Sequence, residues 1–245
     1  MWWVSYGGGI NSTALIILLV QNKLPKYQPW KAIFADTGCE RPDTYSYIEK
    51  VFTPYLQRNG HKLIVVRPKE SVIERWERLS VTGSRIIRSC TEEAKIEPIA
   101  HFTGPKAEVI IGFSMEESHR ANKRKRSKKE DRILRYPLIE KEIDREDCKQ
   151  IIEEAHLCLP IKSGCWCCPN LRVGEILDLV KKYPERAQRI ERLERAAIEK
   201  HGDNGERHQF HDRPMSYWFK RAANEEAQLI MFSALEETAP CECWL

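Results

Sequence analysis

Three consecutive glycines, Gly7, Gly8 and Gly9, separate an apolar segment from the hydroxyl-bearing residues Ser12 and Thr13. Glycines let backbone N–H groups approach phosphate oxygens without side-chain obstruction, and the amino end of a following helix adds partial positive charge. The pattern therefore predicts a phosphate-binding loop, although it matches neither the Walker A nor the GxGxxG fingerprint. The alternative interpretation is a plain tight turn in which Ser12 caps the helix.

The chain contains nine cysteines, and their spacing indicates a second kind of chemistry. Cys158, Cys165 and Cys168 form a C-x6-C-x2-C pattern in a loop with glycine and proline, and Cys90 precedes an expected helix. In a reducing compartment such cysteines are more often metal ligands or reactive thiols than disulfides. Four thiolates suit tetrahedral Zn²⁺ or a [4Fe–4S] cluster, and spacing alone does not distinguish the two. The alternative is that these cysteines are small buried hydrophobic residues.

Positive charge is concentrated in residues 120–135, which hold nine Lys and Arg against Glu130 and Asp131. The local charge of +7 leaves −3 for the rest of a chain whose net charge is +4. Charge runs are commonly solvated. At the carboxyl edge of a parallel sheet, however, the same segment would contact nucleotide phosphates or a nucleic-acid backbone. We expect Arg120 to contact phosphate.

The elements that must position these residues alternate along the first half of the chain. Apolar segments predict strands at residues 1–6, 31–35, 63–66 and 108–113, with a further short strand at 135–139. Helical patterns between them predict an α/β fold, a parallel twisted sheet with helices on both faces. Helical patterns continue at residues 145–156, 172–200 and 215–235. We therefore expect a nucleotide-binding α/β domain at 1–143 and a helical region at 144–245 that carries the cysteine-rich loop.

The composition is that of an ordinary globular protein: 42% of the 245 residues are hydrophobic and 31% are charged. No apolar run approaches the roughly 18 residues that a membrane-spanning helix needs, and no basic and apolar leader precedes the glycine loop. We therefore expect a cytoplasmic protein without a membrane partner. The sequence leaves the oligomeric state open.

Residues 5–13 (SYGGGINST) resemble the SGGxDS loop of the PP-loop superfamily, and within it the phosphoadenosine phosphosulfate reductase family. Further stretches follow in the order typical of that family: 34–38 with 42–45, then 90–91 with 95–98, then 112 with 116–120. The resemblance covers roughly residues 3–140 and implies an adenine-nucleotide site. The implied nucleotide-binding residues are Ser5, Tyr6, Gly7, Gly8, Gly9, Asn11, Ser12 and Thr13 near the phosphates, Phe34 and Asp36 near the adenosine, and Arg120.

The loop departs from the family pattern at two positions. Gly7 stands where the family usually has serine, and Asn11 stands where it usually has aspartate. An aspartate beside phosphates is tolerated mainly when Mg²⁺ bridges the negative charges, whereas an amide donates directly to a phosphate oxygen. The sequence therefore leaves open whether the site uses Mg²⁺ as a cofactor.

The cysteines extend the resemblance to iron–sulfur members of the same family, the DNA phosphorothioation sulfurtransferases. That resemblance rests on the stretches 90–91, 164–166 and 168. It favours a [4Fe–4S] cluster over zinc, with Cys90, Cys158, Cys165 and Cys168 as the ligands.

The last five residues, CECWL, are similar to the mobile tail on which sulfonucleotide reductases carry a nucleophilic cysteine. The resemblance makes Cys243 the candidate catalytic residue. A terminus without function is the alternative.

Together these features predict an adenine-nucleotide-dependent enzyme with sulfurtransferase or reductase chemistry through an adenylyl group or a sulfonucleotide. An alternative within the family is a phosphoadenosine phosphosulfate or adenosine phosphosulfate reductase. An alternative of another class is a nucleic-acid-binding module with a structural zinc and a degenerate nucleotide site. Residues 120–135 would then bind the nucleic acid.

Overall fold

The structure, a computed structural model, describes residues 1–87, 89–125, 132–203, 208–211 and 213–238. The chain divides into two compact units. The first contains Met1–Ile73 and Arg88–Cys165, and the second contains Glu74–Ile87 and Trp166–Leu245. The domain division expected at residue 143 falls inside the first unit.

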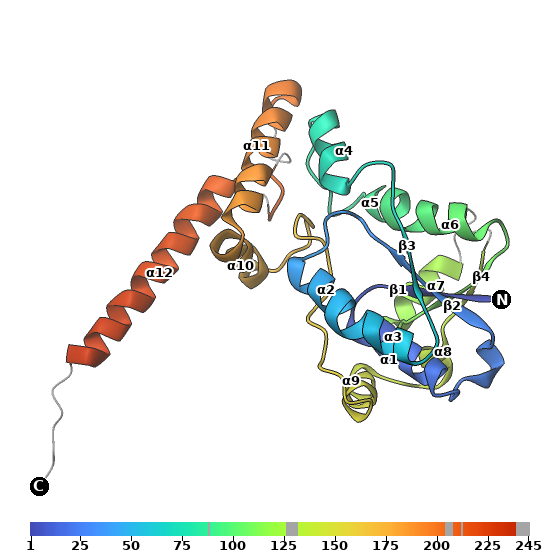
Figure 1. The fold of residues 1–245 in the computed structure, drawn as a ribbon. Helices are drawn as coiled ribbons and strands as arrows, with labels where there is room; N and C mark the ends of the chain where they lie inside the picture. The colour runs from blue at the N-terminus through green and yellow to red at the C-terminus, as the bar shows by residue number, and fades with distance from the viewer. Residues whose placement is uncertain (88, 126–131, 204–207, 212, 239–245) are drawn as a thin grey trace, which may run out of the picture. The chain divides into compact units, whose positions relative to one another are not determined.

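A five-stranded parallel sheet forms the centre of the first unit (Figure 1). Its strands are β1 (Trp2–Tyr6), β2 (Trp30–Ala35), β3 (Leu63–Val66), β4 (Glu108–Ile111) and β5 (Ile133–Arg135), in the order β3-β2-β1-β4-β5. After β3 the chain returns to pair β4 with the opposite side of β1. The loops that follow β1 and β4 therefore diverge, and such a switch point is where open α/β sheets bind ligands.

The two faces of the sheet follow the alternation of side chains along the strands. Val4, Tyr6 and Phe34 face a core that also contains most of α1 (Ile10–Val20) and the buried side of α9 (Arg145–Glu154). Their neighbours Ile33 and Ala35 face the other side, where Ile99 of α6 (Glu97–Thr103) packs on them. Helices thus cover both faces, which confirms the predicted α/β fold.

The remaining helical elements of the first unit connect the strands. They are η1 (Pro25–Tyr27), α2 (Pro42–Tyr47), η2 (Ile48–Phe52), α3 (Thr53–Arg58), α5 (Ser89–Thr91), η3 (Glu92–Ile96), η4 (Met115–Glu117), α7 (Ser118–Lys125) and α8 (Pro137–Glu140). The strand expected at 135–139 is wrong in extent. Strand β5 ends at Arg135 and α8 begins at Pro137, because proline suits a first helical turn and cannot donate to a sheet.

The second unit is helical, with α10 (Val173–Lys182), α11 (Pro184–His201) and α12 (Met215–Thr238). Helix α4 (Val72–Leu79) lies mostly in this unit, and the guanidinium of Arg189 donates to both carboxylate oxygens of its Glu77 at 2.6 and 2.7 Å. Buried Glu194 accepts hydrogen bonds at 2.8 Å from the backbone N–H groups of Gln209 and Met215. These contacts tie residues far apart in the sequence into one unit.

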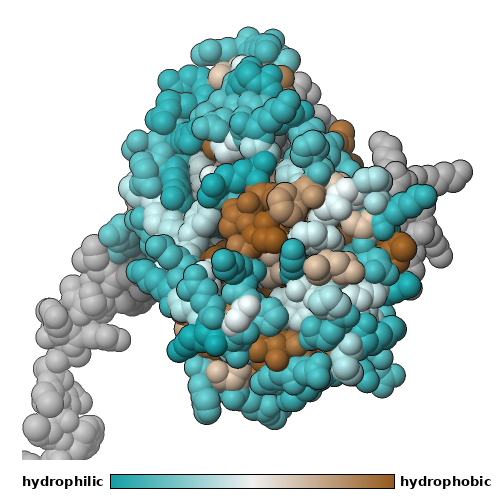
Figure 2. Space-filling model, turned by 45° about the vertical axis from the view of Figure 1, so that its right-hand side comes forward, coloured by the Kyte–Doolittle hydropathy of each residue, from teal (hydrophilic) through white to brown (hydrophobic). Residues whose placement is uncertain are grey.

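The surface view of one face is mainly hydrophilic, with smaller hydrophobic areas between the polar residues (Figure 2). Within the part of the chain that the structure describes, no helix combines the length and apolar character required to cross a membrane.

Candidate functional site

The glycine loop connects β1 to α1 and is braced by Ser12. The Ser12 hydroxyl accepts from Gly7 N–H at 3.2 Å and donates to Gly9 C=O at 3.1 Å. Gly9 itself is the N-cap of α1, and no side chain caps the helix. Ser12 is therefore not the helix cap, because its hydroxyl lies within the helix and holds the loop against it.

Two glycines are required by close packing around this loop. Gly8 has φ +71°, and a Cβ added there would lie 2.9 Å from Cγ2 of Thr44. A Cβ on Gly112, just after β4, would lie 2.9 Å from Cα of Ser12 and 3.1 Å from the carbonyl oxygen of Asn11. The backbone after β4 therefore passes directly against the first turn of α1, and a side chain at Gly112 would displace it.

A cleft of about 440 Å³ opens in the first unit beside this loop, at the switch point between β1 and β4. Its charged lining contains five cations and one carboxylate: Lys95, Arg120, Arg132, Arg145, Lys162 and Glu117. Its apolar lining consists of Ile10, Ile96, Ile99, Val109, Ile111, Phe113 and Leu134. An excess of positive charge beside an apolar wall suits a ligand that joins an anionic group to a flat hydrophobic one.

Several residues predicted to bind nucleotide line this cleft: Ser5, Gly7, Gly9, Asn11, Ser12 and Arg120. The guanidinium of Arg120 lies 4.3 Å from the ring centroid of Phe113, which orients it across the cleft wall. Tyr6, Thr13 and Phe34 are buried in the core behind the loop. These side chains support the loop from behind. For example, the hydroxyls of Tyr6 and Thr13 are in contact at 3.3 Å.

Four cations of the cleft were not singled out individually from the sequence. Arg132 lies in the basic segment, and its side chain reaches the same cleft as Arg120 at the other end of that segment. Lys95 lies in a stretch that resembles the family, which was the available signal. Lys162 and Arg145 come from segments that carry no phosphate-binding pattern, so only the tertiary structure places them here.

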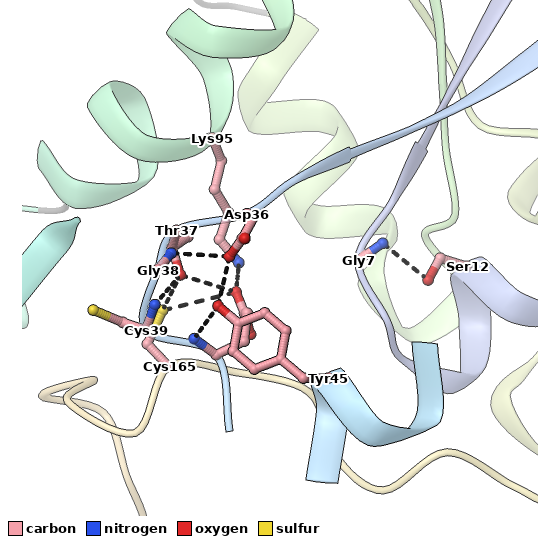
Figure 3. A network of polar contacts seen from close by, with 10 residues as sticks. Gly7, Ser12, Asp36, Thr37, Gly38, Cys39, Tyr45, Lys95 and Cys165 are labelled. Atoms are coloured by element: carbon pink, nitrogen blue, oxygen red, sulfur yellow. Dashed lines mark hydrogen bonds and ion pairs between the residues drawn. The ribbon is translucent and has the colours of Figure 1, made fainter. Parts of the chain in front are cut away.

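Asp36, expected near the adenosine, is held by three donors, of which Figure 3 shows Tyr45 and Gly38. Its carboxylate accepts from the Tyr45 hydroxyl at 2.5 Å, from Gly38 N–H at 3.0 Å and from Nε of Arg67 at 2.9 Å. Burial opposes its ionisation, but the hydrogen bonds from Tyr45, Gly38 and Arg67 outweigh burial and lower the pKa of Asp36. The carboxylate therefore braces the turn after β2.

A buried polar cluster adjoins this turn and contains one predicted metal ligand, Cys165 (Figure 3). Oε1 of buried Glu40 lies 2.9 Å from Nζ of Lys95, 3.4 Å from the Thr37 hydroxyl and 3.8 Å from Sγ of Cys165. Burial, with a contribution from the Glu40 charge, raises the pKa of the Cys165 thiol. Because Lys95 also lines the cleft, it joins the Cys165 cluster to the candidate nucleotide site.

The segment that carries Cys165 also approaches the glycine loop. The Ser163 hydroxyl would lie 2.9 Å from a Cβ added to Gly9, and Arg41 N–H donates to Gly164 C=O at 3.1 Å. Of the cysteines predicted to bind metal, Cys158 is exposed and the other three are half-buried, and none of the four is in a disulfide. In the described ranges, no three Cys, His, Asp or Glu side chains are arranged to hold a metal ion. Cys243 lies outside the described residues.

Comparison with protein families matches residues 1–157 to the phosphoadenosine phosphosulfate reductase domain. Among curated proteins, the chain is similar to the uncharacterized protein MJ0066 of Methanocaldococcus jannaschii, with 26% identity over 224 residues. The alignment covers 81% of this chain but 42% of that relative, so the chain spans about two-fifths of the relative's length. Among solved structures, it is similar to the U34-tRNA thiolase NcsA from Methanococcus maripaludis with its [4Fe-4S] cluster. That match has 16% identity and a TM-score of 0.47, and it covers 90% of this chain and 80% of the other.

Proposed function

Because the chain belongs to the phosphoadenosine phosphosulfate reductase domain family, we propose that its cleft binds an adenine nucleotide. The protein is then an enzyme that acts through an adenylyl group or a sulfonucleotide, with sulfur transfer as the favoured chemistry. One observation carries this proposal: the glycine loop and five cationic side chains line one cleft at the switch point of the sheet.

The chemistry that this cleft offers is orientation and electrostatic stabilisation. Backbone N–H groups at the start of α1 and the guanidinium groups of Arg120 and Arg132 would neutralise charge on phosphate or sulfate oxygens. Fixed donors of this kind stabilise charge that develops on a leaving group without reorganising during the reaction. The apolar wall would receive the adenine base.

A cysteine sulfur is the proposed nucleophile, either on Cys243 or at a centre bound by Cys90, Cys158, Cys165 and Cys168. The donor chemistry of four thiols that are not in disulfides fits a [4Fe–4S] cluster or zinc. A bound cluster would supply redox chemistry or a site for sulfur. The described side chains do not form a group of three metal ligands.

Gly112→Ala tests the nucleotide site. Its added Cβ would meet the backbone of Ser12 at 2.9 Å. Overpacking costs roughly 1–3 kcal/mol, which corresponds to an affinity loss of about 5- to 150-fold when the cost falls on the binding-competent loop. Calorimetry with ATP and with adenosine phosphosulfate measures that loss. Gly174→Ala in α10 is the matched control, because its added Cβ has no heavy atom within 4 Å. Parental affinity in Gly112→Ala would mean that the loop is not the nucleotide site.

The alternatives are separated on anaerobically purified protein. Release of sulfite from a sulfonucleotide without ATP consumption would identify a reductase instead of a sulfurtransferase. Iron with sulfide would support the cluster, whereas about one zinc per chain would indicate a structural four-thiolate site. Finding neither metal would remove the metal centre from the proposal and leave Cys243 as its nucleophile.

A further inference from the structure

The side-chain amide of Asn11 connects the glycine loop to the segment after β4. Its Nδ2 donates to Oε2 of Glu117 at 2.9 Å and to Oγ of Ser114 at 3.0 Å. Asn11 is buried, and both Asn11 and Glu117 line the cleft. This amide is therefore a contact between the two loops that diverge at the switch point.

The partners determine which way the amide points. A carboxylate only accepts hydrogen bonds, so Glu117 requires a donor. The Ser114 hydroxyl uses its one proton to donate to Oε2 of Glu116 at 2.6 Å, a bond that helps to lower the pKa of Glu116. Ser114 can then only accept from Asn11. The two N–H groups of Asn11 satisfy both acceptors at once.

An aspartate at position 11 would offer neither partner a donor. Its carboxylate would face the carboxylate of Glu117 at hydrogen-bond distance and the lone pairs of Ser114. Two carboxylates in such contact require a proton or a bridging cation. Arg120 already forms an ion pair with Glu117, but through Oε1, whereas the amide of Asn11 contacts Oε2.

We infer, on the basis of the proposed nucleotide site, that the Asn11 amide takes the place of a divalent cation beside Glu117 and Ser114. The cleft then binds its nucleotide as the metal-free anion. The charges of the phosphates are then met by protein cations, Arg120, Arg132 and Lys162 among those that line the cleft. Asn11 is a specificity-determining residue in this arrangement, because it decides which ionic form of the nucleotide fits.

The first measurement uses nucleotide-free protein. Thermal unfolding of the parent in EDTA and in Mg²⁺ should give the same midpoint. Asn11→Asp should unfold at a lower temperature in EDTA and recover in Mg²⁺ or Mn²⁺, since the cation joins the two carboxylates. Asn11→Asp/Glu117→Gln is the matched control: it restores a donor between the two positions, so it should lose the response to Mg²⁺.

The second measurement is calorimetry with adenosine phosphosulfate in EDTA and in Mg²⁺. The parent should bind equally in both, while Asn11→Asp should bind at least about tenfold more weakly in EDTA, because Ser114 and Glu117 lose their donor. A parent that requires Mg²⁺ for binding, or an Asn11→Asp protein indifferent to Mg²⁺ in both measurements, overturns the inference. A parent that binds no nucleotide in either condition contradicts the proposed function, and the unfolding measurement then still decides the role of Asn11.

Discussion

Nζ of Lys95 lies 2.9 Å from Oε1 of Glu40, whose side chain is fully buried, whereas 38% of the Lys95 side chain is exposed. The pair brings a cation of the cleft to a carboxylate beside Cys165. Glu40 therefore depends on Lys95 for compensation of its charge.

Removing the cation alone should be costly. Lys95→Met leaves an uncompensated buried carboxylate and should lower the free energy of unfolding by about 3–5 kcal/mol. Glu40→Gln/Lys95→Met should recover most of that loss. Urea denaturation measures all three proteins. Lys26→Met is the control, because its exposed pair with Glu140 at 3.5 Å is worth about 0–1 kcal/mol. Equal losses in the two lysine variants would show that Glu40 does not need its partner.

The buried carboxyl of Glu194 should make the stability of the second unit depend on pH. Burial raises its pKa from an ordinary value of 4.5 to about 7, although the backbone N–H groups of Gln209 and Met215 oppose the shift. Between these values the folded state binds more protons than the unfolded state, so stability should fall as the pH rises from about 4.5 to 7. The change is of the order of 3 kcal/mol.

Unfolding midpoints measured across that pH range test this expectation. Glu194→Gln should flatten the profile, because the amide carries no titrating proton. Glu199→Gln, at an exposed position on the same helix, should leave it unchanged. A parental profile with no slope between pH 4.5 and 7 would show that Glu194 is ionised throughout.

The basic segment tests the competing nucleic-acid role. Replacing Lys123, Arg124, Lys125 and Arg126 with serine should weaken nucleic-acid binding and flatten its salt dependence. Each lost phosphate contact removes roughly 0.7–0.9 from the log–log slope. Binding titrations at several salt concentrations measure the slope. Loss of nucleotide affinity with an unchanged slope would instead assign the segment to the small-molecule site.

The sequence was sufficient to predict the α/β fold, because buried strands and intervening helices leave distinct apolar periods. It was also sufficient to locate the glycine loop, since a strand, three glycines and a helix lie within twenty residues of each other. The full cationic lining of the cleft could not be predicted from the sequence, because Lys162 and Arg145 reach the cleft from segments whose local patterns are unrelated to phosphate. The three donors to Asp36 likewise depend on packing between separate elements. Cysteine spacing predicts a metal centre, and this stays a prediction.

The second unit is built from two stretches of chain that are separated by the second segment of the first unit, Arg88–Cys165. During synthesis, Glu77 leaves the ribosome 112 residues before Arg189, and Gly83 leaves it 126 residues before Gln209. Glu77 must wait for Arg189, and Gly83 must wait for the Gln209 side chain to which its N–H donates at 2.7 Å. The sheet can therefore assemble first, while residues 74–87, which connect β3 to α5, still lack their packing partners. A truncation after residue 165 would leave residues 74–87 permanently without these partners, and we expect it to expose Trp76, which is buried in the intact chain.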